Sequence, residues 1–168
     1  MVLSPVEDFP TAKITTLDEL PKDGHWAVMT RSRRDEAALL HLQNIMKDRL
    51  IVSEVWKELL PQASIMISSA ISGGSLKERF EEAVKGRSCW LLPEPMKATF
   101  PLPFPDGIEL PNVYIPEHGF YSEFLCCYYM HYFGIARTHV VLWDTEETMT
   151  QKIQLAKALG FHGLVDPS

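Results

Sequence analysis

The sequence predicts an α/β protein whose sheet is mainly parallel, with helices that cross over between its strands. Three short apolar stretches, at 25–30, 64–72 and 89–92, are typical of strands covered on both faces. Segments with helical spacing separate them, which favours right-handed crossovers within one sheet. The segment 139–166 adds the order strand, helix, glycine, strand, typical of a β-α-β unit. We expect five or six strands, and a shortened or incomplete β/α barrel is one form that such a sheet takes.

The N-terminal half supplies the first elements of this pattern. Residues 1–24 hold three prolines and few periodic apolar residues, which predicts an extended arm. Helical periodicity follows from about 35 to 50, and a second helical piece at 53–60 ends before a proline. One long helix with a bend near Ile51 and Val52 is the alternative for this region.

The next helix has a capping signal at its start. Ser75 and Glu78 have capping-box spacing, in which the serine hydroxyl accepts from a free backbone N–H and the glutamate reaches back. A helix is therefore predicted from Ser75 to about Gly86, before the strand at 89–92.

A proline-rich loop interrupts the regular pattern at 93–119, where seven prolines fall. Because proline removes a donor and fixes φ, neither a helix nor a central strand is expected there. Phe100, Leu102 and Phe104 are too apolar for a solvated linker, so we expect the loop to pack across the protein.

Aromatic residues then dominate 120–133, and aromatic residues favour strands. We expect a strand at 127–133 joined through Gly134 in a hairpin to a strand at 138–143. A helix capped by Ser122 is the alternative.

Composition narrows the class of protein. The chain has 168 residues, which suits a single domain, and its net charge of −6 argues against a general binder of nucleic acid or anionic membranes. The three cysteines form no disulfide framework and no CxxC pair, and neither a secretion signal nor an apolar run of about 18 residues is present. A cytoplasmic location is therefore expected.

The C-terminal segment follows a longer pattern: an aromatic hairpin, a strand, an acidic turn, a helix of the form K-x-x-L-A-K-x-x-G and a last strand. The residues that carry it are His139, Trp143, Asp144, Thr148, Lys152, Leu155, Ala156, Lys157, Gly160 and Gly163. This segment, residues 133–166 and about a fifth of the chain, resembles the final portion of glycoside hydrolase family 18 barrels, particularly the bacterial spore-associated, peptidoglycan-directed branch.

The resemblance implies a (β/α)₈ barrel with an acid catalyst in a D-x-x-D-x-D-x-E signature, and the chain departs from both. No such spacing of carboxylates occurs, and barrels of this kind require about 250 residues. The family's last strand commonly supplies a tryptophan to the sugar site, where this chain has only Leu164, Val165 and Asp166 before a proline. The resemblance therefore implies a shortened, catalytically silent relative.

Two carboxylates are the candidate catalytic residues. Glu94 follows the strand at 89–92 directly, and Asp144 ends the strand at 138–143, which are the positions of catalytic groups in parallel sheets. If they share one cleft, environment can push their pKa values apart for acid–base work. The alternatives are a carboxylate in a proline-shaped turn for Glu94 and a helix cap, with Glu147, for Asp144.

Aromatic residues and histidines are the candidate ligand-binding residues, because aromatic faces suit sugars and apolar ligands. They are Trp90, Tyr121, His131, His139 and Trp143. Filling of the core is the alternative. No histidines have H-x-x-x-H or H-E-x-x-H spacing, so no metal and no cofactor are expected.

Adjacent cysteines raise one further possibility. Cys126 and Cys127 act as nucleophiles only if one lies beside His131 with a lowered thiol pKa. Buried packing is the alternative, because free cysteine is among the most buried residue types.

We therefore expect a non-catalytic ligand- or partner-binding protein related to a carbohydrate-active barrel, with a saccharide or a protein as its partner. One alternative is a small glycosidase-like hydrolase that uses Glu94 and Asp144; another is a structural or assembly protein without a small-molecule site. Whether the protein is an enzyme is left open. An incomplete barrel has an open edge, which a homodimer or the proline-rich loop would cover.

Overall fold

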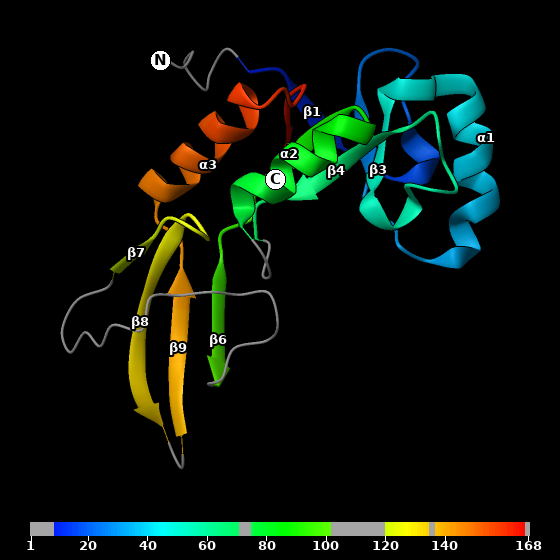
Figure 1. Cartoon of the computed structure of the whole chain (residues 1–168). Coiled ribbons are helices and arrows are strands. Elements are labelled where there is room, and N and C mark those ends of the chain that lie inside the picture. Colours follow the sequence, from blue (N-terminus) through cyan, green and yellow to red (C-terminus); the bar gives the residue numbers. More distant parts are fainter. Residues whose placement is uncertain (1–8, 71–74, 102–119, 135–136, 167–168) are drawn as a thin grey trace.

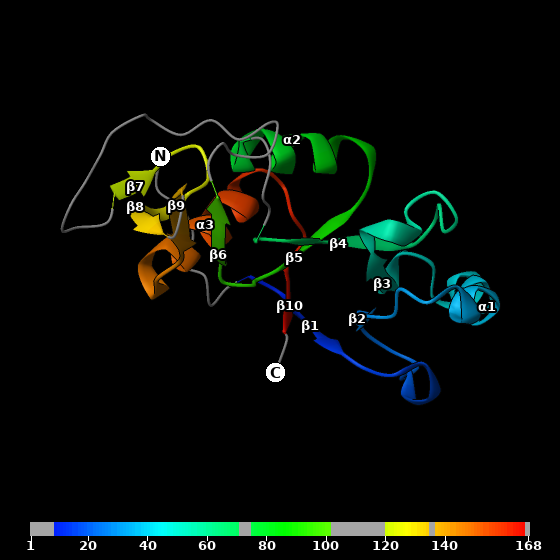
Figure 2. The ribbon, with the colours of Figure 1, turned by 90° about the horizontal axis from the view of Figure 1, so that it is seen from below.

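The computed structural model describes residues 9–70, 75–101, 120–134 and 137–166, with only the backbone described at 98–101, 131–134 and 137–138. These residues form a closed barrel of six parallel strands and a separate four-stranded antiparallel sheet. The antiparallel sheet and helix α1 lie on opposite sides of the barrel (Figure 1 and Figure 2). The predicted α/β class with a mainly parallel sheet is confirmed.

The barrel strands are short and alternate with helices along the chain. The strands are β1 (Thr11–Ile14), β2 (Trp26–Val28), β3 (Leu50–Ser53), β4 (Ser64–Ser68), β5 (Cys89–Leu92) and β10 (Leu164–Asp166). The helices are α1 (Glu36–Met46), α2 (Leu76–Gly86) and α3 (Glu146–Ala158), and the 3₁₀ turns are η2 (Leu17–Glu19), η3 (Arg33–Asp35), η4 (Lys47–Arg49) and η5 (Glu54–Trp56). Ser75 caps α2 as predicted, since its hydroxyl accepts from the backbone N–H of Glu78.

The barrel closes through its first strand. β1 pairs in parallel with β10 on one side and β2 on the other, in the order β1-β10-β5-β4-β3-β2. Residues 11–14, predicted as part of an extended arm, are thus a structural strand; few periodic residues mark it because it is only four residues long. The described barrel is closed and has no open strand edge for a second copy of the chain to cover.

The second helical piece predicted after residue 50 is wrong, and so is the alternative of one bent helix. Ile51 and Val52 lie in β3, and only the single 3₁₀ turn η5 follows. Both side chains are fully buried, Ile51 in the barrel interior and Val52 in the layer under the helices. A strand buried on both faces has no polar alternation, so its apolar run merges with the helical pattern around it.

Apolar side chains fill two layers of the barrel. The interior holds Ala12, Ala27, Ile51, Met66, Trp90, Leu92 and Val165. The layer between strands and helices includes Leu39, Val52, Ile65, Ile67, Phe80, Leu91, Ala156 and Phe161. This alternation along each strand is what a filled barrel with an outer ring of helices requires.

The antiparallel sheet is inserted between β5 and α3. Its strands are β6 (Lys97–Pro101), β7 (Phe120–Ser122), β8 (Cys127–Gly134) and β9 (Arg137–Trp143), in the order β6-β9-β8-β7. The predicted strand at 127–133 and its hairpin to the next strand are confirmed. However, β9 pairs antiparallel with β6 and β8 and is outside the barrel, so 139–166 is not a β-α-β unit of one sheet. The parallel partners of β10 are β1 and β5.

The proline-rich segment 93–119 is only partly described. Its residues 97–101 form the edge strand β6, a position that tolerates the proline at its end. Residues 102–119 lie outside the described part of the chain, as does the predicted packing of that loop. No helix in the described ranges is both long and apolar enough to cross a membrane.

Candidate functional site

Three aromatic residues form a row across one face of the antiparallel sheet. Strand pairing places Tyr121 opposite Tyr128, and Tyr128 opposite Trp143. The Tyr128 and Trp143 rings stack with centroids 5.9 Å apart at 25°, and the Tyr121 ring meets Tyr128 edge-on at 5.8 Å. The opposite face of the sheet carries buried residues such as Tyr129 and Leu142. The row therefore lies on the more exposed face.

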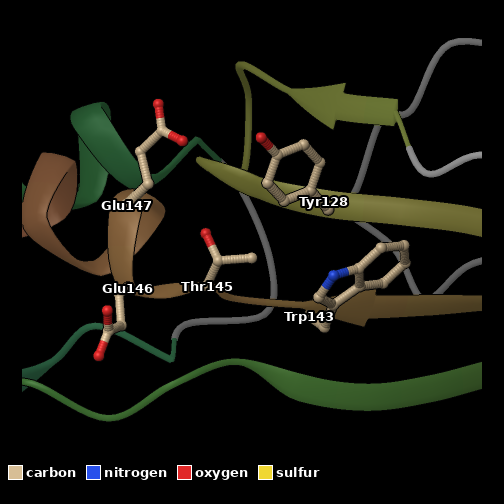
Figure 3. Close-up of a pocket in the computed structure, with 5 residues that line it drawn as sticks. All are labelled: Tyr128, Trp143, Thr145, Glu146 and Glu147. Atoms are coloured by element: carbon tan, nitrogen blue, oxygen red, sulfur yellow. The ribbon is translucent and has the colours of Figure 1, made fainter.

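A broad, open hollow of about 520 Å³ lies at one end of this row, lined by Tyr128, Trp143, Thr145, Glu146 and Glu147 (Figure 3). Trp143 is the last residue of β9, and α3 begins three residues later. The first turn of α3 therefore stands beside the aromatic pair. The two rings thus line one side of the hollow, and the Thr145, Glu146 and Glu147 side chains line the other (Figure 3).

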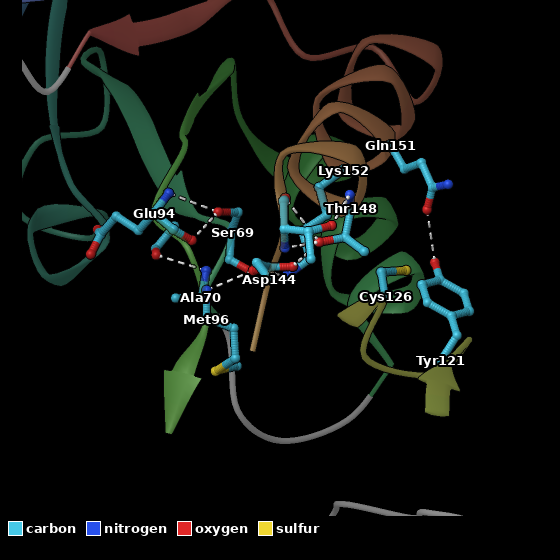
Figure 4. Close-up of polar contacts among 12 residues, drawn as sticks. Ser69, Ala70, Glu94, Met96, Tyr121, Cys126, Asp144, Thr148, Gln151 and Lys152 are labelled. Atoms are coloured by element: carbon cyan, nitrogen blue, oxygen red, sulfur yellow. Dashed lines mark hydrogen bonds and ion pairs between the residues drawn. The ribbon is translucent and has the colours of Figure 1, made fainter. Parts of the chain in front are cut away.

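Asp144, between Trp143 and the helix, is held by a buried ion pair. Its Oδ2 lies 2.7 Å from Nζ of Lys152, and both side chains have no exposed surface (Figure 4). Oδ2 also accepts from the backbone N–H of Met96 at 2.6 Å, and Oδ1 accepts from the Thr148 hydroxyl at 2.7 Å. The carboxylate therefore ties the end of β9 to α3 and to the residue before β6.

The same network reaches the barrel through Ser69, which follows β4. Lys152 Nζ donates to the Ser69 carbonyl at 3.4 Å. The Ser69 hydroxyl donates to the Glu94 carbonyl at 2.6 Å and accepts from the Glu94 N–H at 2.8 Å (Figure 4). The two strand ends β4 and β5, the antiparallel sheet and α3 are thus linked by polar contacts at one place.

The helix cap is one residue later than the predicted alternative for Asp144. Thr145 is the N-cap of α3: its hydroxyl accepts from the Thr148 N–H, and the Thr148 hydroxyl accepts from the Thr145 N–H. Threonine can supply both halves of this capping box because its hydroxyl both donates and accepts. Asp144 supports the cap from outside by accepting from Thr148.

The cavity that Glu94 lines does not include Asp144, whose side chain has no exposed surface. Glu94 lines a separate cavity of about 210 Å³ at the carboxyl ends of barrel strands β2 to β5, and its carboxylate is directed away from Asp144 (Figure 4). The residues of this cavity are Met29, Arg31, Ser53, Glu54, Met66, Ser68, Leu92 and Glu94. The second carboxylate that lines this cavity is that of Glu54, which follows β3 and forms an ion pair with Arg79.

The predicted ligand-binding residues fall in three places. Tyr121 and Trp143 belong to the aromatic row, and His139 lies further along β9. Trp90 is 3% exposed inside the barrel, where the rings of His25 and His162 flank it. The side chain of His131 lies outside the described part.

Tyr128, Glu146 and Glu147 belong to the hollow but were not among the predicted residues. The aromatic density at 120–133 pointed to the right segment, but only the strand register shows which rings lie together. Within the described ranges, no three His, Cys, Asp or Glu side chains converge as metal ligands.

The cysteines lie in surroundings that oppose thiolate formation. Burial raises the pKa of the Cys127 thiol to about 12 and that of Cys89 to about 11, and burial also raises the pKa of Cys126. The thiolate is the nucleophile, so these environments oppose nucleophilic catalysis by Cys126 or Cys127.

We expect thiol labelling of the native protein at pH 8 to modify Cys126 first, because it is only half-buried, whereas Cys89 and Cys127 are buried. With a pKa near 11, only about one Cys89 in a thousand is ionised at this pH. Mass spectrometry of peptides after labelling with and without urea tests this. Rapid native labelling of Cys127 would contradict it.

No protein-family model matches the chain, and no curated protein is significantly similar to it. Two solved structures are similar to part of it. The spore cortex-lytic enzyme SleL of Bacillus cereus matches with a TM-score of 0.48 at 15% identity, over 84% of this chain and 44% of that one. SleL of Bacillus megaterium QM B1551 matches with a TM-score of 0.45 at the same identity and coverage. This chain thus spans less than half the length of either enzyme, and their activity does not carry over to it at this level of similarity.

Proposed function

We propose that the protein is a non-catalytic saccharide-binding protein and that the hollow beside Tyr128 and Trp143 is its binding site. The observation that carries the proposal is the stacked pair of rings on the sheet's more exposed face, with Thr145, Glu146 and Glu147 around it. A sugar ring presents an apolar C–H face and a rim of hydroxyls. Aromatic faces suit the first, and a few placed polar groups orient the second.

The row favours a chain of sugars over a single unit. Neighbouring strands lie about 4.8 Å apart, so three rings on adjacent strands span about 10 Å. Tyr121 extends the row on β7, where its hydroxyl donates to Oε1 of Gln151 on α3 at 3.2 Å. That bond fixes the outer ring against the helix and so preorganises the surface.

Binding without catalysis is supported by the surroundings of the acids. The Asp144 carboxylate has no exposed surface and is occupied by three partners. Glu146 and Glu147 are exposed beside an open hollow. Acid–base catalysis on glycosides depends on carboxyl groups in a closed, preorganised site, which this hollow does not provide.

The test is equilibrium binding to a panel of cell-wall saccharides, measured by tryptophan fluorescence and by calorimetry. Trp143→Ala should weaken binding about tenfold or more, since it removes one face of the aromatic pair. Trp26→Ala, at the start of β2 and outside the hollow, is the matched control and should bind like the wild type. Absence of binding to every saccharide in the panel would refute the proposal.

The cavity at the barrel mouth favours a second candidate, a small glycosidase-like hydrolase, because two carboxylates, Glu54 and Glu94, line it together. Hydrolysis of chromogenic glycosides that is abolished in Glu94→Gln and unaffected in Trp143→Ala would favour this candidate. Absence of turnover with unchanged saccharide binding in Glu94→Gln would favour the hollow.

A further inference from the structure

We propose that the hollow selects saccharides that carry a protonated amine, that is, amino sugars without an acetyl group. This inference rests on the proposed saccharide-binding function and names the class of sugar. Its basis is the charge of the hollow relative to its aromatic pair.

The hollow contains two negative side chains and no positive one. Glu146 and Glu147 line it, and neither carboxylate takes part in the ion pairs of the described residues. Other acids have such partners: Glu54 pairs with Arg79, and Asp166 with Lys13.

The cations near the hollow do not neutralise these acids. Lys152 is buried and bound to Asp144. Lys97 lies opposite Trp143 at the end of the row and is exposed, but it is not among the residues that line the hollow. Lys97 is thus next to Trp143 on the same face of the sheet, but a ligand in the hollow meets the two carboxylates that line it and no cation that lines it.

The helix dipole alone explains why two acids lie at the start of α3, but it does not explain the rings beside them. Carboxylates in the first turn of a helix stabilise it through the helix dipole, and α3 has both in its first turn. The dipole does not explain why stacked rings on another element stand beside them. The capping box also occupies the Thr145 and Thr148 N–H groups, which leaves fewer donors for an anion.

A protonated amine would use both features of the hollow. The ring faces of Tyr128 and Trp143 attract a cation through their quadrupoles, and carboxylates accept charge-assisted hydrogen bonds from an ammonium group. An N-acetyl group brings no charge, so it leaves Glu146 and Glu147 without a counterion. The same sugar backbone with and without the acetyl group thus differs in the interaction that the hollow is built to make.

The experiment compares two oligomers of equal length, tri-N-acetylglucosamine and triglucosamine, by calorimetry at low ionic strength and a pH that keeps the amines protonated. We expect triglucosamine to bind about tenfold tighter, from cation–π and charge-assisted contacts together. Glu146→Gln with Glu147→Gln should abolish this preference while keeping the affinity for the acetylated oligomer within about twofold, since the amides are nearly isosteric.

The matched control is the double variant Glu58→Gln with Glu82→Gln. Both of these acids are exposed, and neither lines the hollow. This pair has the same effect on net charge and should keep the preference. Equal or tighter binding of the acetylated oligomer, or a preference that survives Glu146→Gln with Glu147→Gln, would overturn the inference. Those outcomes leave the proposed function standing. Failure of both oligomers, together with failure of the wider panel, would instead remove the proposed function.

Discussion

Replacing Lys152 with methionine should lower the free energy of unfolding by about 3–5 kcal/mol, the cost of leaving one charge of a buried pair uncompensated. Lys152 and Asp144 are 2.7 Å apart, and neither side chain has exposed surface. Methionine keeps the unbranched stem of lysine, so the change removes the charge with little change in packing. Urea unfolding followed by circular dichroism measures the effect.

Two further variants separate loss of charge from loss of packing. Asp144→Asn alone should also destabilise strongly, because it leaves the ammonium group buried without a counterion. Lys152→Met combined with Asp144→Asn removes both charges and should cost less than the sum of the two single changes. Asp144 accepts from the Met96 N–H and from the Thr148 hydroxyl through different oxygens, so asparagine, with one side-chain oxygen, can keep only one of these two bonds as an acceptor.

Lys13→Met is the matched control, because Lys13 belongs to an ion pair with Asp166 and is 67% exposed. Exposed pairs contribute about 0–1 kcal/mol. If Lys152→Met cost no more than Lys13→Met, the buried pair would not be what joins α3 to the two sheets.

The barrel is the part of the fold that the sequence predicts best. Strands β2, β4 and β5 lie within the apolar stretches predicted for them, because buried parallel strands are short apolar runs bounded by other signals. β1 and β3 were missed for opposite reasons. β1 has four residues, two of them polar, whereas the apolar run of β3 continues the pattern of α1 without a break.

Topology was harder to predict than the elements. The strand at 138–143 was correctly predicted, but its assignment to the parallel sheet was wrong. Whether a strand joins the barrel or a separate sheet depends on its hydrogen bonds. β8 is the hairpin neighbour of this strand, but its other partner, β6, lies far from it in the sequence. The aromatic residues of β8 and β9 favour strands without specifying their partners.

For the candidate site, too, the sequence predicts the segments but not which side chains meet. Tyr128 and Trp143 are fifteen positions apart, and only the hairpin register brings their rings together. Asp144 was identified as an important acid, yet its partner Lys152 lies two helical turns further on, and nothing in its spacing shows that both are buried. The assignment of catalytic roles to Glu94 and Asp144 stays a prediction.

Gly163→Ala should destabilise the protein by about 3 kcal/mol, at the upper end of the usual cost of overpacking. A Cβ at this position would clash with the Pro10 carbonyl and lie 2.5 Å from a ring carbon of Trp90. Neither neighbour can move easily. Pro10 precedes β1, and its carbonyl accepts from the Leu164 N–H at 2.8 Å, while the Trp90 ring is buried in the barrel interior.

The matched control is Gly160→Ala, which lowers stability through backbone strain and not through a steric clash. Gly160 has φ +103° at the end of α3 and open space around its Cα, so alanine there meets backbone strain of about 1–2 kcal/mol and no clash. Thermal and urea unfolding of both variants should rank Gly163→Ala as the less stable. Because Gly163 lies where β1, β5 and β10 meet, equal stability of Gly163→Ala and the wild type would contradict the closure of the barrel through β1.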